Sequence, residues 1–127
     1  MSETISSSHA AAPVAAYSQA VSAGDLVFVS GQIPLDPESN ELISDSIEAA
    51  TKQSLRNVQR ILEAAGLELR HVVKASVFLI NTEDYAGMDA TYKSIMSEPF
   101  PAREAIFVAG LPKNARVEIS VIAHTKR

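Results

Sequence analysis

The chain has 127 residues, of which 46% are hydrophobic and 20% are charged, and this suits one domain with a substantial core. It contains no cysteine, which excludes disulfides, thiolate zinc sites and a cysteine nucleophile. Its formal net charge is −4, whereas a nucleic-acid-binding protein usually presents a basic face. We therefore expect a single domain over residues 1–127 and no nucleic-acid partner.

The first twelve residues, Met1 to Ala12, are rich in Ser and Ala and contain Glu3 but no Lys or Arg. A mitochondrial presequence requires arginines and few acids, and a secretory signal requires a basic start and an apolar stretch. No run of about 18 apolar residues suggests a membrane span. We expect a flexible lead-in over residues 1–12, a cytoplasmic location in preference to a mitochondrial one, and no membrane association.

Two short β-like runs, residues 17–22 and 26–30, flank Ala23-Gly24-Asp25, which predicts a hairpin. A polar loop with two prolines then extends to Ser44.

Residues 46–65 form the clearest predicted helix, because apolar side chains recur every three or four positions. Asp45 with Glu48 fits a capping box at its start, and Gly66 fits its C-terminal cap. Three basic residues at helical spacing lie between Glu48 and Glu63, which predicts a solvated face and not a basic groove. These residues are Lys52, Arg56 and Arg60.

A second helix is predicted to start at Asn81 or Thr82 and to extend to about Met96, with Gly87 inside it. Three further β-like segments complete the chain. They are residues 71–80, 103–109 and 115–124. The order β-β-α-β-α-β-β predicts an α/β (α+β) fold, in which one mixed sheet has two helices packed on one face.

The last predicted strand shows what we expect on the other face of the sheet. Val117, Ile119 and Val121 alternate with a set that is too polar for a core and too apolar to lie wholly in water. This second set is Arg116, Glu118, Ser120, Ile122 and His124. We expect such a face to associate with copies of the same chain.

Arg103 and Glu118 are the candidate site residues, and we place them on adjacent strands. A guanidinium can grip a carboxylate through two parallel bonds, so the pair could bind an acid substrate with a water. The residues alone equally allow a structural ion pair. Ser30 has no histidine in a shared motif, and the spacing of the three histidines predicts no metal site.

Six segments of the chain together resemble the reactive-intermediate deaminase (Rid) family, also called the L-PSP endoribonucleases. The resemblance extends from about residue 13 to residue 124, and the spacing of the segments is more specific than any one of them. The segments are Ala16-Tyr17-Ser18-Gln19-Ala20, Phe28 to Pro34, Asn57 to Gly66, Val73-Lys74-Ala75, Pro101-Ala102-Arg103 and Leu111 to Ile119.

The resemblance implies a chorismate-mutase-like fold and a homotrimer with clefts between subunits. It implies cofactor-free hydrolysis of enamines and imines, such as 2-aminoacrylate, to 2-keto acids and ammonia. The small ligands are accordingly 2-imino and 2-keto acids.

Residue by residue, the resemblance implies that Arg103 binds the substrate carboxylate and that Glu118 helps to position a water. Tyr17 either caps the cleft or is an ordinary interface aromatic residue. Ser30 and Gly31 are expected to line the pocket, and the residue two after the arginine, Ala105, is expected to offer its backbone amide.

The chain departs from the family pattern at three places. Glu104 replaces a common Ser or Thr, and its side chain should point away from that of Arg103. Asp89 stands where the family often has Asn, and its charge would weaken substrate binding if it approaches the carboxylate. Ala15-Ala16 replaces a Gly-Pro, a change that need only alter the lead-in.

Two other functions stay open for a chain of this kind. The first is a non-catalytic trimer that senses a ligand or binds a protein. The second is a translation-inhibiting ribonuclease, which the acidic charge and the lack of a basic groove disfavour.

Overall fold

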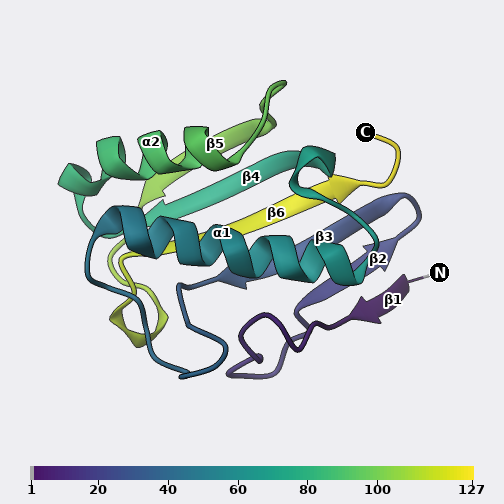
Figure 1. The fold of residues 1–127 in the computed structure, drawn as a ribbon, viewed down its shortest axis with the longest axis horizontal. Helices are drawn as coiled ribbons and strands as arrows, with labels where there is room; N and C mark the ends of the chain where they lie inside the picture. The colour runs from purple at the N-terminus through teal and green to yellow at the C-terminus, as the bar shows by residue number, and fades with distance from the viewer. Residues whose placement is uncertain (1) are drawn as a thin grey trace.

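The computed structural model describes residues 2–127, which form one six-stranded sheet with two α-helices on one face (Figure 1). The strand order is β1-β2-β3-β6-β4-β5, and every neighbouring pair is antiparallel except the parallel pair β4 and β5. The elements are β1 (Ser2–Ile5), β2 (Ala20–Ala23), β3 (Leu26–Gln32), α1 (Ile47–Ala64), β4 (Val72–Leu79), α2 (Tyr85–Ile95), β5 (Ala102–Phe107) and β6 (Val117–His124). The expected mixed sheet with two helices is confirmed.

The N-terminal segment differs from the expected flexible lead-in, because Ser2–Ile5 forms strand β1 at the edge of the sheet. The buried side chain of Gln19 explains how the segment after β1 is held. Its amide oxygen accepts from the backbone N–H of Ser7 at 2.6 Å, and its nitrogen donates to the carbonyl of Ala11 at 2.8 Å. Met1, which the expected lead-in includes, lies outside the described residues.

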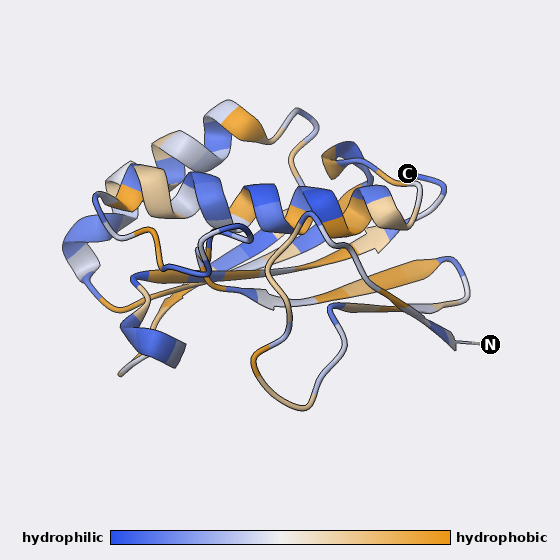
Figure 2. Cartoon of the chain, turned by 60° about the horizontal axis from the view of Figure 1, so that its bottom comes forward, coloured by the Kyte–Doolittle hydropathy of each residue, from blue (hydrophilic) through white to orange (hydrophobic). Residues whose placement is uncertain are grey.

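Helix α1 agrees with its predicted range, but its cap lies one residue later than expected. Ser46 is the N-cap, and its hydroxyl accepts from the backbone N–H of Ala49 at 3.0 Å, so the Asp45 capping box is not formed. Gly66 fulfils its predicted role: it takes the left-handed conformation at φ +77° and donates to the carbonyl of Glu63. The apolar stripe of α1 faces the sheet (Figure 2).

The core lies between the helices and strands β3, β6 and β4. Alternate residues of β6, namely Val117, Ile119 and Val121, are buried beneath the helices, as the alternation predicted. Within the described part of the chain, no α-helix covers the other face of the sheet, as Figure 2 shows. Phe28 and Ile106 remain 41% and 45% exposed there, so this face combines exposed apolar side chains with polar ones.

Helix α2 starts later than predicted, because Thr82–Asp84 first forms a 3₁₀ turn. The buried carboxylate of Asp84 accepts two bonds from Arg116, at 2.8 Å from Nη2 and at 3.3 Å from Nε. Arg116 was expected on the open sheet face. It lies instead before the start of β6 and turns to Asp84, which ties the start of α2 to the sheet.

Gly87 of α2 lies directly against the start of α1. A Cβ atom at this position would lie 2.6 Å from Cγ2 of Ile47 and 2.6 Å from Oε2 of Glu48. Glycine at this position therefore permits the close contact between the helices. The stabilisation from this packing outweighs the cost of the poor helix propensity of glycine.

We expect Gly87→Ala to destabilise the protein although alanine is the better helix former. The helix-propensity gain is about 1 kcal/mol, whereas displacing the packed side chain of the buried Ile47 costs about 1–3 kcal/mol. Urea unfolding of the variant and of the wild type measures the difference. Gly110→Ala is the matched control, because a Cβ at Gly110 meets nothing within 4 Å. A Gly87→Ala variant more stable than the wild type would contradict this account of the close contact.

Candidate functional site

A β-bulge in β3 shapes the centre of the candidate site. The pairing of β3 with β6 shifts between Val29 and Gln32, so β3 has one more residue than β6 at Ser30 and Gly31. Bulges are frequent beside functional sites, because they redirect the side chains and backbone of one strand. This bulge brings Gly31 against Glu118 of the neighbouring strand.

The contact between Gly31 and Glu118 leaves no room for a side chain at position 31. A Cβ on Gly31 would lie 2.6 Å from Oε2 of Glu118 and 2.7 Å from its carboxyl carbon. The absence of a side chain therefore lets the Glu118 carboxyl group lie directly over the β3 backbone.

A hollow of about 320 Å³ opens beside this contact and contains four of the predicted site residues. Glu118 is the only carboxylate in a lining made mainly of apolar groups. The lining residues are Val14, Ala15, Tyr17, Ser30, Gly31, Ile33, Pro112 and Glu118. The sequence thus predicted Tyr17, Ser30, Gly31 and Glu118 as residues that the structure does bring together.

Hydrogen bonds fix the rim of this hollow. The Ser30 hydroxyl donates to the carbonyl of Ser18 at 2.7 Å, which holds the preceding loop against β3. The Tyr17 hydroxyl accepts from the backbone N–H of Val14 at 3.3 Å, while the residue as a whole stays 42% exposed. Because the proton of the Ser30 hydroxyl is engaged, this side chain shapes the pocket and is poorly placed to donate to a ligand.

Burial raises the pKa of Glu118 above its ordinary value, because the surrounding apolar groups disfavour the charged form. A carboxyl group whose pKa moves toward neutrality can both accept and return a proton. The hollow therefore contains a group suited to general acid–base chemistry.

Arg103 lies elsewhere, on the face of the sheet that the helices cover. It is in register with Ala75, which is fully buried in the core, and residues in register share a face. Its Nη1 donates to Asp89 at 2.9 Å and its Nη2 donates to the Tyr85 hydroxyl at 2.9 Å. Its Cζ lies 4.8 Å from the ring centroid of Tyr92, a cation–π contact.

The expected placement of Arg103 and Glu118 on adjacent strands is wrong. Strand β4 lies between β5 and β6, and Glu118 is in register with Phe78, which alternates with the buried Val77 and Leu79. Within one chain the two side chains therefore point to opposite faces of the sheet. The structural ion pair between them, left open by the sequence, is also excluded, because Arg103 pairs with Asp89.

Two other predicted site residues, Ala105 and Asp89, lie on the same side of the sheet as Arg103. Ala105, two positions further along the edge strand β5, lies on the same face and packs against the core. Asp89 extends from α2 to the guanidinium. Glu104 points to the opposite face, as expected, where it contacts Ser76 and pairs with Lys74 at 3.0 Å. The hydrogen bond from Ser76, followed by that from Lys74, lowers the pKa of Glu104.

Sequence reasoning missed the two tyrosines that hold Arg103. Tyr85, Asp89 and Tyr92 are spaced by four and three residues, so they share one face of α2, and this pattern could have identified them. Tyr92 is buried and its hydroxyl has no hydrogen-bond partner among the described residues. Burial raises its pKa, and the nearby Arg103 opposes that rise.

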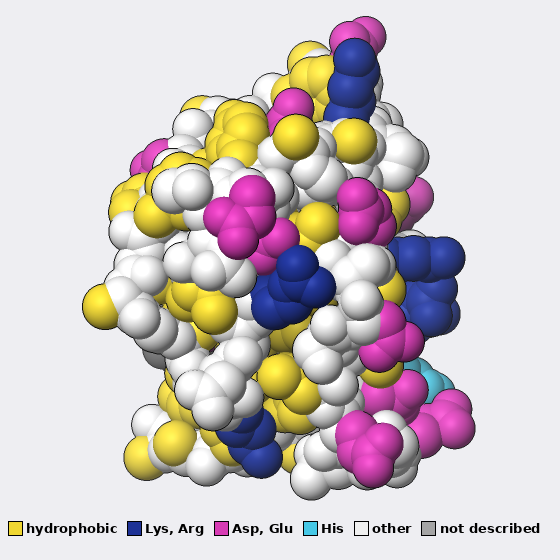
Figure 3. All heavy atoms as spheres, turned by 90° about the vertical axis from the view of Figure 1, so that its left-hand side faces the viewer, with side chains coloured by type: hydrophobic (Ala, Val, Ile, Leu, Met, Phe, Trp, Pro, Cys, Tyr) yellow, Lys and Arg dark blue, Asp and Glu magenta, His cyan; other side chains and the backbone are white. Residues whose placement is uncertain are grey.

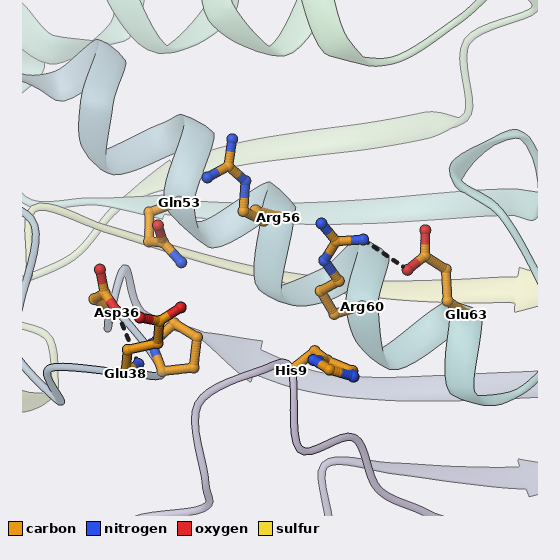
Figure 4. Close-up of a pocket in the computed structure, with 8 residues that line it drawn as sticks. His9, Asp36, Glu38, Gln53, Arg56, Arg60 and Glu63 are labelled. Atoms are coloured by element: carbon orange, nitrogen blue, oxygen red, sulfur yellow. Dashed lines mark hydrogen bonds and ion pairs between the residues drawn. The ribbon is translucent and has the colours of Figure 1, made fainter.

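A second hollow, of about 600 Å³, lies against α1 and the loop after β3 (Figure 4). Its lining carries charges of both signs, and three of the charged side chains are engaged with each other or with the backbone. Arg60 pairs with Glu63 at 3.0 Å, and Asp36 accepts from the backbone N–H of Glu38 at 2.8 Å. The lining of this hollow is mainly charged and polar, and it has no carboxylate surrounded by apolar groups as Glu118 is, so we do not take it as the candidate site.

Residues 2–127 contain neither a cluster of potential metal ligands nor an apolar helix of membrane-spanning length. No group of three or more His, Asp and Glu side chains in this range converges as a metal site would require. No helix in the same range combines the length and apolar character of a membrane span.

The chain matches the family described as Endoribonuclease L-PSP over residues 7–125, and it belongs to that family. This is the RidA/YjgF family that the sequence resembles, so the resemblance is confirmed. Among curated relatives, the chain is 43% identical over 126 residues to the 2-iminobutanoate/2-iminopropanoate deaminase of Salmonella typhimurium, covering 97% of this chain and 98% of that protein.

Solved structures of the family have the same fold. RidA of an Antarctic Psychrobacter species is 43% identical and superposes with a TM-score of 0.93, covering 96% of this chain and 98% of that one. The YjgF gene product of Escherichia coli is 38% identical with a TM-score of 0.90, over the same shares of the two chains.

The raised pKa of Glu118 gives a stability test with a defined sign. The folded state holds this proton more tightly than the unfolded state, so stability falls as the pH rises through the interval between the two pKa values. We expect Glu118→Gln, which stays neutral, to be more stable than the wild type near pH 7.5. The advantage should shrink at about pH 4, just below the ordinary pKa of a glutamate, where the wild-type carboxyl group is largely protonated in both states.

Urea unfolding at both pH values measures this difference at equal protein concentration. Glu83→Gln, at an exposed glutamate before α2, controls for the change in net charge. A Glu118→Gln advantage that does not change with pH would show that ionisation of Glu118 does not cause it.

Proposed function

We propose that this protein hydrolyses small 2-imino acids, such as 2-iminobutanoate and 2-iminopropanoate, to 2-keto acids and ammonia. The observation that carries the proposal is the half-buried Glu118, with its raised pKa, in a hollow that also contains Tyr17, Ser30 and Gly31. The names of the deaminase relatives support the substrate class.

The division of the residues between two faces supports a site shared by two subunits. Arg103 is on the edge strand β5, whereas Glu118 is on the open face, which no α-helix of residues 2–127 covers. An edge of one chain placed over the open face of the next would bring an Arg103 to the hollow of a neighbour. A head-to-tail contact forms a closed ring when the rotation between subunits permits it, and we propose a homotrimer with three equivalent clefts.

In the proposed reaction, Arg103 binds the substrate carboxylate and thereby fixes the position of the imine carbon. An enamine first tautomerises to its imine. The imine reacts in its N-protonated form. Glu118 accepts a proton from water as the water oxygen bonds to the imine carbon, and the electron pair of the C=N double bond makes the nitrogen a neutral amine. Glu118 returns this proton to the nitrogen, and the C–N bond breaks with its electron pair leaving on ammonia. The hydroxyl oxygen forms the C=O bond of the keto acid and gives its proton to Glu118, which releases it to the ammonia or to solvent. The oxygen of the product comes from the water.

A ribonuclease function has less support than deamination. The net charge is −4, and on the face shown in Figure 3 basic side chains are interspersed with acidic ones. RNA binding through phosphates would favour a continuous basic surface.

Mixing two inactive variants tests whether the cleft is shared. We expect Arg103→Lys and Glu118→Gln each to lose most of the activity in a coupled assay with a serine or threonine dehydratase. Co-expressed in equal amounts, the two chains should recover about one quarter of the wild-type activity, because about one cleft in four combines an intact Arg103 with an intact Glu118. No recovery in mixed oligomers would contradict the shared cleft, as would a wild type that sediments as a monomer of 13.6 kDa.

Substitution of Arg103 tests the carboxylate anchor. Lysine keeps the charge but loses the planar fork of donors, so we expect Arg103→Lys to fold and to bind 2-oxobutanoate about 30- to 150-fold more weakly. This corresponds to about 2–3 kcal/mol for a charged bidentate contact. Calorimetry measures the affinity, and Arg56→Lys on the exposed face of α1 is the matched control. Equal binding by Arg103→Lys and the wild type would remove Arg103 from this role.

A further inference from the structure

A second carboxylate already lies against the guanidinium that is proposed to bind substrate. Oδ1 of Asp89 accepts from Nη1 of Arg103 at 2.9 Å. The Arg103 side chain is only 18% exposed, whereas that of Asp89 is 47% exposed. A ligand that reaches Arg103 therefore meets the charge of Asp89 as well.

Contacts with α2 hold Arg103 but do not exhaust its hydrogen-bonding capacity. Asp89 takes one N–H of Nη1 and the Tyr85 hydroxyl takes one N–H of Nη2, while Tyr92 packs on the guanidinium. A guanidinium has five N–H donors, so other donors can receive a second carboxylate. That carboxylate would share its cation with Asp89, and the two anions would repel each other at short range.

The charge next to the carboxylate of the ligand then decides how Asp89 acts. An amino acid, or an imino acid protonated on nitrogen, has a cationic N–H group one carbon away from its carboxylate. Asp89 can accept a hydrogen bond from this group, which offsets the repulsion. A 2-keto acid has a carbonyl oxygen in the same place, and it offers Asp89 no proton.

We propose that Asp89 is a specificity-determining residue, which makes the Arg103 site select ligands with a cationic nitrogen beside the carboxylate over 2-keto acids. This inference rests on the proposed function, because it takes Arg103 as the carboxylate anchor. In the proposed reaction Asp89 favours the N-protonated imine. After ammonia leaves, it destabilises the bound keto acid and speeds its release.

Two ligands with the same carbon skeleton test the proposal: L-2-aminobutanoate, a zwitterion, and 2-oxobutanoate, a monoanion. Asp89→Asn removes the charge while the amide oxygen can still accept from Arg103, so the geometry is conserved. We expect the variant to bind 2-oxobutanoate on the order of 10-fold more tightly than the wild type does. Its affinity for L-2-aminobutanoate should stay the same or fall. Calorimetry on the intact oligomer gives both affinities, and circular dichroism confirms folding.

Glu83→Gln is the control, since it removes one negative charge just before α2 at an exposed position. It should leave the ratio of the two affinities unchanged. The inference is overturned if Asp89→Asn does not alter this ratio, or if it weakens both ligands equally, as a residue that only positions Arg103 would do.

The Arg103→Lys variant separates this failure from failure of the proposed function. If Arg103→Lys loses both ligands while Asp89→Asn leaves the ratio unchanged, only the role of Asp89 is overturned. If Arg103→Lys binds both ligands as the wild type does, the carboxylate anchor is overturned, and the selectivity proposed for Asp89 is overturned with it.

Discussion

Side chains of a β-strand alternate between the two faces of the sheet, and this constraint divides the functional groups of the protein. Arg103 is in register with the buried Ala75 and therefore lies on the helix side of the sheet. Glu118 is in register with Phe78 and lies on the open face. Neither side chain can change faces without a shift in register that would expose the core. A reaction that needs both groups therefore requires a second chain, and for this reason we treat assembly and chemistry as one proposal.

The two halves of the proposed cleft are organised in different ways. Around Glu118 the backbone of β3 determines where the carboxyl group lies. The bulge in β3 and the missing side chain of Gly31 make room for this carboxyl group in apolar surroundings. Around Arg103 the side chains of α2 orient the functional group, since Tyr85 and Asp89 accept hydrogen bonds from the guanidinium. The first half keeps a proton available, and the second keeps a cation oriented.

Helix α2 links this site to the stability of the fold. Its start is anchored by the pair between Asp84 and Arg116, and its contact with α1 depends on Gly87. The same helix supplies the residues that contact Arg103. Packing of α2 therefore sets the position of the guanidinium, and a change that moves the helix would also move the proposed carboxylate anchor.

Local patterns in the sequence predicted most of the helices and strands and named the candidate site residues. The three- to four-residue repeat of apolar residues identified α1, alternation identified β6 and its buried face, and the spacing of short segments singled out Tyr17, Ser30, Gly31, Arg103 and Glu118. Only the tertiary structure decided which of these residues meet. Strand order, the bulge in β3 and the pairing of Arg103 with Asp89 depend on contacts between segments distant in the chain, and the periodicity of one segment carries no information about its neighbour in the sheet.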